Sequence, residues 1–292
     1  MKYIIQTSNL DFQYSKNKKI LNNLSINVPK GSIYGFLGPN GAGKSTTMRL
    51  LTGIIPDDSN SIFLFEKPIE SQIPNIFEKV GALVESPALY LHLSGYDNVK
   101  YIALLRQVPL SKIDEVLELV DLTAHKRQKA KQYSLGMKQR LAIAMALLSE
   151  PELLFLDEPV NGLDPNGIVE IRKLLVKINK EKGVTIFVSS HLLSEIEKMC
   201  THIGIISKGT LKYEGTMEDL SRKFETCKIQ ITLDDAENWK EKLSFKYANV
   251  VLDEQNKITM NLSHTYEIPD FAKQIIQEGA RIYEIKILEG LE

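Results

Sequence analysis

The sequence predicts an α/β fold in which helices cover both faces of a largely parallel sheet. A glycine-rich loop separates an apolar strand at residues 33–37 from a helix at residues 46–51. Two further apolar strands are expected at residues 153–156 and 184–188, each bounded by helical patterns. Strands that are apolar throughout and alternate with helices are typical of a parallel sheet buried on both faces.

Other elements follow from local patterns. Every second residue is apolar over residues 24–28, which predicts a short strand. Apolar residues at helical spacing predict helices within residues 97–149. Residues 202–207 and 211–214 flank a glycine and predict a β-hairpin.

The composition changes near residue 225, so we expect two domains, at residues 1–222 and 223–292. The smaller one is expected to be α+β, with strand–helix–strand–strand–helix–strand at residues 228–233, 235–243, 248–253, 257–262, 268–278 and 281–287. This order is that of the ferredoxin-like fold. Whether Glu292 is the native end of the chain stays open.

Composition excludes several classes of protein. With 43% hydrophobic and 25% charged residues, the 292-residue chain is typical of a globular protein. A net charge of −1 gives no basic field for nucleic acid. No apolar run approaches the roughly 18–20 residues of a membrane helix, and the start lacks the apolar core of a secretory signal. Cys200 and Cys227 have no pairing or metal spacing, which favours a reducing compartment.

The glycine-rich loop matches the pattern G-x-x-x-x-G-K-S at residues 38–45. Its glycines let the backbone wrap closely and point N–H groups at phosphate oxygens, and the helix that follows also favours anions at its N-terminus. Lys44 is expected to reach the β- and γ-phosphates, and Ser45 to hold Mg²⁺. The candidate nucleotide-binding residues of this loop are Gly38, Asn40, Gly41, Ala42, Gly43, Lys44, Ser45 and Thr46.

Two carboxylates end the apolar strand at residues 153–156. Asp157 is placed to reach the Mg²⁺ beside Ser45, directly or through water. Glu158 is one residue further along and suits a base that orients or deprotonates an attacking water. Behind a phosphate-binding loop, these residues predict nucleotide hydrolysis.

A further run, Tyr-Ser-Leu-Gly-Met-Lys-Gln-Arg at residues 133–140, precedes an apolar helix. It resembles the signature motif of the ATP-binding subunits of ABC transporters, with leucine and methionine where glycine and glutamine are commoner. By this resemblance Ser134 and Gly136 contact ATP held by a second subunit. Backbone N–H groups at a helix N-terminus suit this role. A simple serine N-cap is a compatible alternative.

The resemblance extends over residues 1 to about 220 and implies a RecA-like P-loop core with a helical subdomain at about residues 86–150. It implies ATP and Mg²⁺ as cofactors. It also implies a head-to-tail homodimer that sandwiches two ATP molecules, because each chain carries one copy of each motif. Separate integral membrane permease subunits are the implied partners, which would hold the chain at the cytoplasmic face of the membrane.

The resemblance also implies roles for single residues. Tyr14 is similar to the aromatic residue that stacks on adenine. His191 matches the switch histidine, whose imidazole can bridge the γ-phosphate and Glu158. Asn161 and Asp164 lie in the loop that contacts the partner subunit. The implied catalytic residues are Lys44, Glu158 and His191.

Glu85 stands where most of the family carries a glutamine. An ionised glutamate accepts hydrogen bonds but donates none, and it adds negative charge near Asp157 and Glu158. It can still ligate Mg²⁺ through oxygen. A glutamate here is similar to the ATPases of lantibiotic self-immunity and bacitracin export, which predicts a drug-resistance exporter. The following segment, residues 97–105, is expected to hold the groove for a coupling helix of the permease.

Alternatives stay open at this point. The chain could serve an ABC exporter of another substrate. A soluble ABC ATPase of DNA repair or of ribosomes is disfavoured, because those chains carry a long coiled-coil insertion or two ATP modules. A module that binds ATP without hydrolysing it is disfavoured, because every residue named above for hydrolysis is present.

Overall fold

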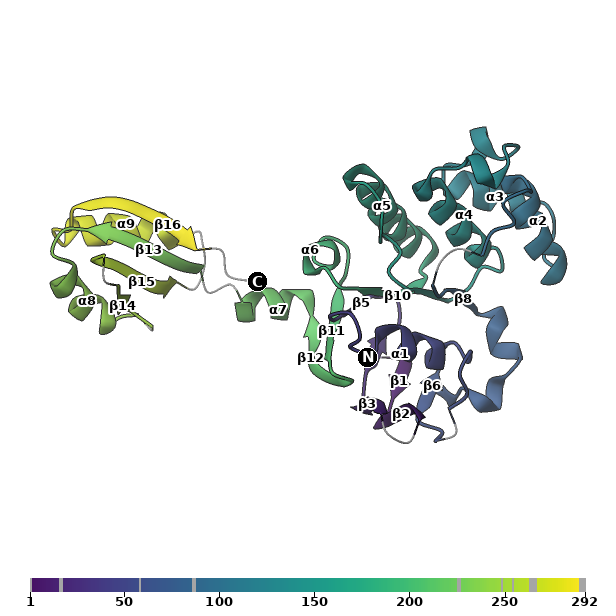
Figure 1. Ribbon diagram of the computed structural model, residues 1–292, viewed down its shortest axis with the longest axis horizontal. Helices are drawn as coiled ribbons and strands as arrows, with labels where there is room; N and C mark the ends of the chain where they lie inside the picture. The colour runs from purple at the N-terminus through teal and green to yellow at the C-terminus, as the bar shows by residue number, and fades with distance from the viewer. Residues whose placement is uncertain are drawn as a thin grey trace. The chain divides into compact units, whose positions relative to one another are not determined.

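The computed structural model shows two compact units, Met1–Met217 and Glu218–Glu292 (Figure 1). It describes residues 2–15, 18–57, 59–85, 88–224, 227–247, 249–253, 255–262 and 267–288. The expected start of the helical subdomain near residue 86, the expected strand start at residue 248 and the chain end at Glu292 lie outside these residues. No helix among the described residues has both the length and the apolar character needed to cross a membrane.

The core of the first unit is a six-stranded sheet in the order β12-β11-β5-β10-β9-β8. Its strands are β5 (Ile33–Leu37), β8 (Val80–Leu83), β9 (Leu153–Leu156), β10 (Thr185–Ser190), β11 (His202–Ser207) and β12 (Thr210–Thr216). All neighbours are parallel except β11 and β12, which form the predicted hairpin. The predicted α/β fold is thus confirmed.

Helices cover both faces of this sheet. In Figure 1, α1 (Lys44–Leu51) lies below the sheet, and α5 (Pro165–Lys182) and α6 (Leu193–Ile196) lie above it. The close approach of α6 to β5 depends on Gly35, because a Cβ there would lie only 2.5 Å from a methyl carbon of Ile196. Cys200 fills the space beside them, and burial raises the pKa of its thiol, so it packs as an apolar side chain.

A second sheet of the first unit is antiparallel, in the order β4-β1-β6-β7. It comprises β1 (Tyr3–Thr7), β4 (Asn27–Pro29), β6 (Ile62–Leu64) and β7 (Lys67–Pro68), and a separate hairpin comprises β2 (Leu10–Ser15) and β3 (Lys18–Leu24). The short 3-10 helices η1 (Glu70–Gln72) and η2 (Asn75–Glu78) follow β7.

The single strand expected at residues 24–28 is wrong. Leu24 ends β3 opposite Leu10, whereas Asn27 begins β4 opposite Gln6. The alternation misled because Leu24, Ile26 and Val28 are all fully buried in one core cluster, although the backbone passes between two sheets. Periodic burial therefore continued across a break in strand pairing.

The helical part of the first unit consists of α2 (Gly95–Leu105), α3 (Lys112–Leu119) and α4 (Leu135–Leu147), with the short 3-10 helices η3 (Thr123–His125) and η4 (Ala130–Gln132) between them. These α-helices pack on one another, and α4 also contacts β8. Serines cap two of them: the Ser94 hydroxyl accepts from the Asp97 amide at 3.0 Å, and the Ser134 hydroxyl accepts from the Met137 amide at 3.2 Å.

The second unit has the predicted ferredoxin-like topology. It contains α7 (Met217–Phe224) at its start, then β13 (Cys227–Leu233), α8 (Ala236–Ser244), β14 (Val251–Leu252), β15 (Lys257–Leu262), α9 (Ile268–Gln277) and β16 (Ile282–Leu288). The antiparallel sheet runs β14-β15-β13-β16, which confirms the expected fold. Alternate residues of β13 and β15 face α8 and α9 around Trp239 and Phe271.

Two phenylalanines of the second unit provide a matched test of this core. Phe271 is 3% exposed and meets Tyr247 edge to face, whereas Phe245 is 91% exposed. We expect Phe271→Ala to lower the free energy of unfolding by about 3–5 kcal/mol. Phe245→Ala should change it by less than about 0.5 kcal/mol.

The measurement is denaturant unfolding followed by tryptophan fluorescence. Trp239 is the single tryptophan of the chain and is buried in this unit, so the signal reports this unit alone. Equal losses for the two variants would contradict the described core.

Candidate nucleotide-binding site

The candidate site lies where three parallel strands end together. In the register of the sheet, Leu37 of β5 lies beside Ser190 of β10, and Val188 of β10 lies beside Leu156 of β9. The phosphate-binding loop follows β5, two carboxylates follow β9, and His191 follows β10. Parallel pairing thus brings the phosphate-binding loop beside segments that are more than one hundred residues further along the sequence.

Backbone conformation shapes the loop between β5 and α1. Gly41 and Gly43 adopt φ angles of 77° and 112°, in the region that favours glycine. A Cβ on Gly38 would collide with the backbone oxygen of Ile206, so only glycine fits there. The loop therefore keeps its backbone free of side chains where it turns into the helix.

Lys44 is the first residue of α1, and its side chain is only 5% exposed. Its ammonium donates to the backbone oxygen of Gly38 at 2.7 Å and to that of Pro39 at 3.3 Å. The same nitrogen lies 3.1 Å from Oε1 of Glu158. The buried cation is thus held by two carbonyl dipoles and one carboxylate, which offset the cost of removing it from water.

The two carboxylates after β9 point to different partners. Asp157 is 9% exposed and accepts a hydrogen bond from the Ser189 hydroxyl at 2.5 Å. Glu158 turns away with φ of 44°, and its Oε2 lies 3.0 Å from Nδ1 of His191. The structure therefore brings Lys44, Glu158 and His191 together.

Ser189 is a residue that the sequence analysis missed. Its hydroxyl donates to Asp157 and accepts from the Glu158 amide at 2.8 Å, so one fully buried group fixes both carboxylate residues. The available signal was its place near the end of a strand, two residues before His191. That place indicates an active-site edge, but the pairing with β9 is needed to find its partners.

Arg49 of α1 is a second residue that was missed, and it links Glu85 with Tyr14. Its Nε donates to Oε1 of Glu85 at 3.1 Å, its Nη2 bonds the same oxygen, and its Nη1 donates to the Tyr14 hydroxyl at 3.1 Å. Hydrogen bonding to Glu85, and then to Tyr14, raises the pKa of Arg49. The negative charge expected from Glu85 is therefore balanced by a cation.

Tyr14 lies near the phosphate-binding helix with its ring accessible. Its hydroxyl is 3.5 Å from Oγ1 of Thr46, and its ring meets Phe12 edge to face at 4.9 Å. The side chain is 57% exposed. A planar face is therefore available beside the loop, as stacking on a base requires.

The signature residues Ser134 and Gly136 are not joined to the phosphate-binding loop by any hydrogen bond among the described residues. They lie instead beside the loop after Glu158: a Cβ on Gly136 would be 3.9 Å from Leu163. Asp164 in that loop caps α5 by accepting from the Gly167 amide at 3.1 Å. The signature segment and this loop thus form a common surface.

A small cavity of about 150 Å³ connects this loop to the catalytic candidates. Its lining includes Glu158, Asn161, Leu163 and His191. Within the part of the chain that the structure describes, no three metal-ligating side chains gather at one point.

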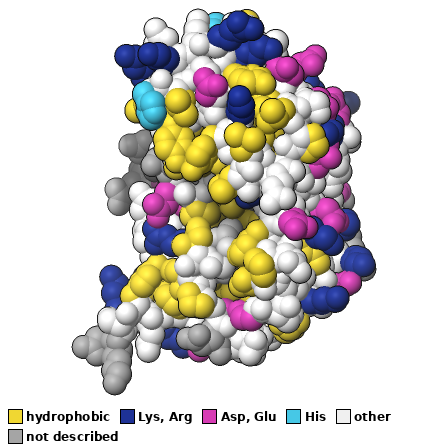
Figure 2. Space-filling view, turned by 90° about the vertical axis from the view of Figure 1, so that its right-hand side faces the viewer, with side chains coloured by type: hydrophobic (Ala, Val, Ile, Leu, Met, Phe, Trp, Pro, Cys, Tyr) yellow, Lys and Arg dark blue, Asp and Glu magenta, His cyan; other side chains and the backbone are white. Residues whose placement is uncertain are grey.

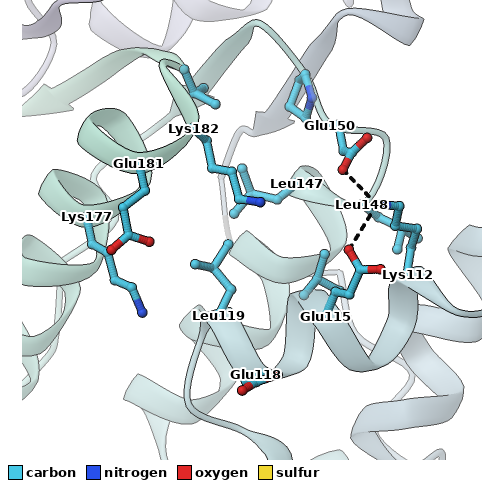
Figure 3. Close-up of a pocket in the computed structure, with 13 residues that line it drawn as sticks. Lys112, Glu115, Glu118, Leu119, Leu147, Leu148, Glu150, Lys177, Glu181 and Lys182 are labelled. Carbon is cyan, nitrogen blue, oxygen red and sulfur yellow. Dashed lines mark hydrogen bonds and ion pairs between the residues drawn. The ribbon is translucent and has the colours of Figure 1, made fainter.

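A larger cavity of about 520 Å³ contains none of these motif residues (Figure 3). It lies where α3 and the end of α4 face the end of α5, and Lys112 bridges Glu115 and Glu150 at its rim at 2.9 and 3.0 Å. Figure 3 shows lysine and glutamate side chains from both sides around an apolar floor. This cavity is therefore separate from the strand-end site.

Comparison with known proteins agrees with this geometry. The sequence model of the family described as ABC transporter matches residues 21–161. The chain is 40% identical to the bacitracin transport ATP-binding protein BcrA of Bacillus licheniformis, over 97% of this chain and 86% of that protein. The chain belongs to the ATP-binding subunits of ABC transporters. It therefore has the ATP-binding and ATPase activity of that family.

Other relatives extend the comparison. The chain is 44% identical to the lantibiotic transport ATP-binding protein SrtF of Streptococcus pyogenes, over 76% of this chain and 96% of that protein. Among solved structures it resembles cbiO1 of Clostridium perfringens, part of the ABC transporter complex cbiONQ. That match has a TM-score of 0.70 and 29% identity, over 84% of this chain and 96% of that one. The fold of this ABC ATPase is thus that of its family.

Ser189→Ala tests the link between the two carboxylate residues. Loss of the hydroxyl leaves the Asp157 carboxylate and the Glu158 amide without a buried partner, which should cost about 1–3 kcal/mol of stability. Displacement of Glu158 should also lower kcat for ATP hydrolysis by up to about 100-fold, with little change in KM.

Thr185→Val is the matched control, since Thr185 is buried at the opposite end of β10 and accepts from the Gly31 amide at 2.9 Å. It should reduce stability and leave kcat unchanged. A kcat for Ser189→Ala equal to that of the control would contradict the positioning role.

Proposed function

We propose that this ABC ATPase powers the export of a peptide antibiotic through separate membrane subunits and so confers resistance. The observation that carries the proposal is Glu85, which stands beside the nucleotide site in a chain whose relatives include bacitracin and lantibiotic transport ATPases. Its hydrogen bond with Arg49 of the phosphate-binding helix supports the proposal, since a movement of that helix would then act on Glu85.

In this proposal the strand-end site holds Mg²⁺–ATP. The buried Lys44 ammonium and the loop amides would bind the phosphates, since they are the concentrated positive groups at this edge of the sheet. Ser45 and Asp157 offer oxygen atoms for Mg²⁺, and Glu85 offers a further carboxylate at greater exposure. Bound Mg²⁺ would supply charge neutralisation at the phosphates.

Glu158 would orient the attacking water and accept its proton. His191 holds the second oxygen of this carboxylate at 3.0 Å, while Lys44 holds the first at 3.1 Å. With both oxygens constrained, the carboxylate keeps one orientation, which is the geometric requirement for a general base. The Tyr14 ring would stack on adenine.

A second copy of the chain would complete each nucleotide site. Ser134 and Gly136 form a surface with the loop of Asn161 and Asp164 and make no hydrogen bond to their own phosphate-binding loop among the described residues. A head-to-tail homodimer would place the signature segment of one copy over the ATP of the other. ATP would then hold the two copies together until it is hydrolysed.

Glu158→Gln tests this arrangement. The amide keeps the shape of the side chain but cannot accept a proton, so ATP binding should persist while hydrolysis falls by about 10²- to 10⁴-fold. We expect the variant to accumulate as a dimer with ATP and Mg²⁺ in size-exclusion chromatography with light scattering. Lys44→Ala, which removes the buried cation, should bind no ATP and show no ATP-dependent change in its association state. An association state of Glu158→Gln that does not change when ATP and Mg²⁺ are added would contradict the sandwich.

The permease would dock on the face that carries α2. Figure 2 shows apolar side chains gathered on this face of the molecule. Leu104 and Leu105 of α2 are 62% and 68% exposed, and Phe77 of η2 is also exposed. Exposed apolar groups of this density indicate a protein-binding surface, and a permease helix lying there would hold the chain at the cytoplasmic face of the membrane. We propose no nucleic-acid partner, because the net charge is −1.

Drug susceptibility tests the transported substrate. A strain carrying this chain and its neighbouring membrane subunits should resist one compound in a panel of lantibiotics, bacitracin and unrelated small drugs. Glu158→Gln should abolish that resistance, because hydrolysis fails. Glu85→Gln should keep ATP binding and lower resistance, because the charged pair with Arg49 is lost.

Each outcome of this experiment is informative. Resistance confined to an unrelated small drug would replace the peptide-antibiotic proposal with another exporter. Unchanged resistance with Glu85→Gln would leave Glu85 without a role in coupling. The family assignment is independent of both results.

A further inference from the structure

The second unit has one long open sheet edge. Among the described residues, β16 pairs with β13 on one side and with no strand on the other, and it spans seven residues. The opposite edge, β14, has only two residues. An open strand presents a row of N–H and C=O groups that can pair with another chain, and proteins commonly limit this by keeping edge strands short. The sheet limits its β14 edge in this way and leaves its β16 edge long, with a register shift between Ile282 and Glu284 at the start of the strand.

The open edge also carries exposed apolar side chains. Tyr283 is 71% exposed and Ile287 is 49% exposed, although the strand also contributes Ile282 and Ile285 to the core. Aromatic and β-branched side chains are favourable in cross-strand pairs. The edge therefore offers both backbone groups and side chains suited to a further strand.

The sequence of β16 is complementary to itself when the strand is reversed. Glu284 and Lys286 are both exposed, flank Ile285, and form no ion pair with the described part of the chain. If two copies of β16 pair antiparallel about a two-fold axis at Ile285, Glu284 of each copy lies opposite Lys286 of the other. Tyr283 of each copy then lies opposite Ile287 of the other. Every exposed side chain of the strand centre thus gains a complementary partner.

The charges also select this register over its neighbours. A two-fold axis at Glu284 would place that carboxylate opposite its own copy, and an axis at Lys286 would do the same with two ammonium groups. Like charges directly opposite one another are destabilising. A two-fold axis is the commonest symmetry of homodimers, and it requires a self-complementary surface of this kind.

We propose that the C-terminal units of two copies of this chain pair through β16, joining two four-stranded sheets into one. The partner is a second copy, because the charge pattern matches its own reverse. This contact uses none of the nucleotide-binding residues. It therefore forms without ATP and keeps two ATPase units together between hydrolysis cycles, beyond the ATP-dependent sandwich proposed above.

Charge exchange on the full-length chain tests the pairing. Glu284→Lys places lysine opposite Lys286 of the second copy, and Lys286→Glu places glutamate opposite Glu284. Because two attractive pairs become repulsive, each single variant should raise the dimer dissociation constant at least about tenfold. The double variant restores both pairs with their signs exchanged and should return the constant to that of the wild type. The measurement is sedimentation velocity at low ionic strength, with EDTA and no nucleotide.

Mixing the two single variants provides the decisive control. A chain with two lysines at these positions and a chain with two glutamates should form a 1:1 heterodimer, although each alone is largely monomeric. Misfolding would not give this rescue, and the double variant, whose net charge equals that of the wild type, excludes a general charge effect. A wild-type chain that is monomeric at all accessible concentrations, or single variants that dimerise like the wild type, would overturn the proposal.

The same charge changes in the Glu158→Gln variant distinguish the β16 contact from the nucleotide sandwich. Single variants in the Glu158→Gln background should still dimerise with ATP and Mg²⁺, since the sandwich does not involve β16. Loss of the ATP-dependent dimer there would show that the charge changes act on the nucleotide contact, which would also overturn the proposal. Failure of the sandwich alone would leave the nucleotide-free dimer intact.

Discussion

The parallel pairing of β10 with both β5 and β9 is the constraint on which the site depends. It sets Leu37 beside Ser190 and Leu156 beside Val188, so that the segments following all three strands meet at one edge. The fully buried aromatic rings of Tyr34, Phe155 and Phe187 pack within this sheet and fix its spacing. Loops and helix caps then determine the positions of single side chains, whereas strand pairing determines which segments lie next to one another.

The buried charged side chains at this edge of the sheet are connected by ion pairs and hydrogen bonds. The Lys44 ammonium, the Glu158 carboxylate and the His191 ring are linked within 3.1 Å, and Ser189 joins the Glu158 backbone to Asp157. Buried charges are tolerated when each is paired and hydrogen-bonded, and removal of one member leaves another uncompensated. The same network that allows burial also holds each catalytic candidate in one orientation.

The Arg49–Glu85 pair extends this network toward the surface. Arg49 belongs to the helix that begins at Lys44, whereas Glu85 follows β8 and precedes the helical part of the unit. The pair therefore connects the nucleotide site with the segment that leads to the exposed apolar side chains of α2.

The sequence by itself determined the features that depend on neighbours along the chain. These are the phosphate-binding loop, the carboxylates after a buried strand, and the ferredoxin-like order of the second unit, all encoded by glycine spacing and short-range periodicity. Tertiary structure decided the rest. The bridging role of Ser189, the pairing of Arg49 with Glu85 and the division of residues 24–28 between two sheets all depend on strand register and on packing between distant segments. No local pattern encodes which distant group a side chain will meet, because that choice is made when the sheets assemble.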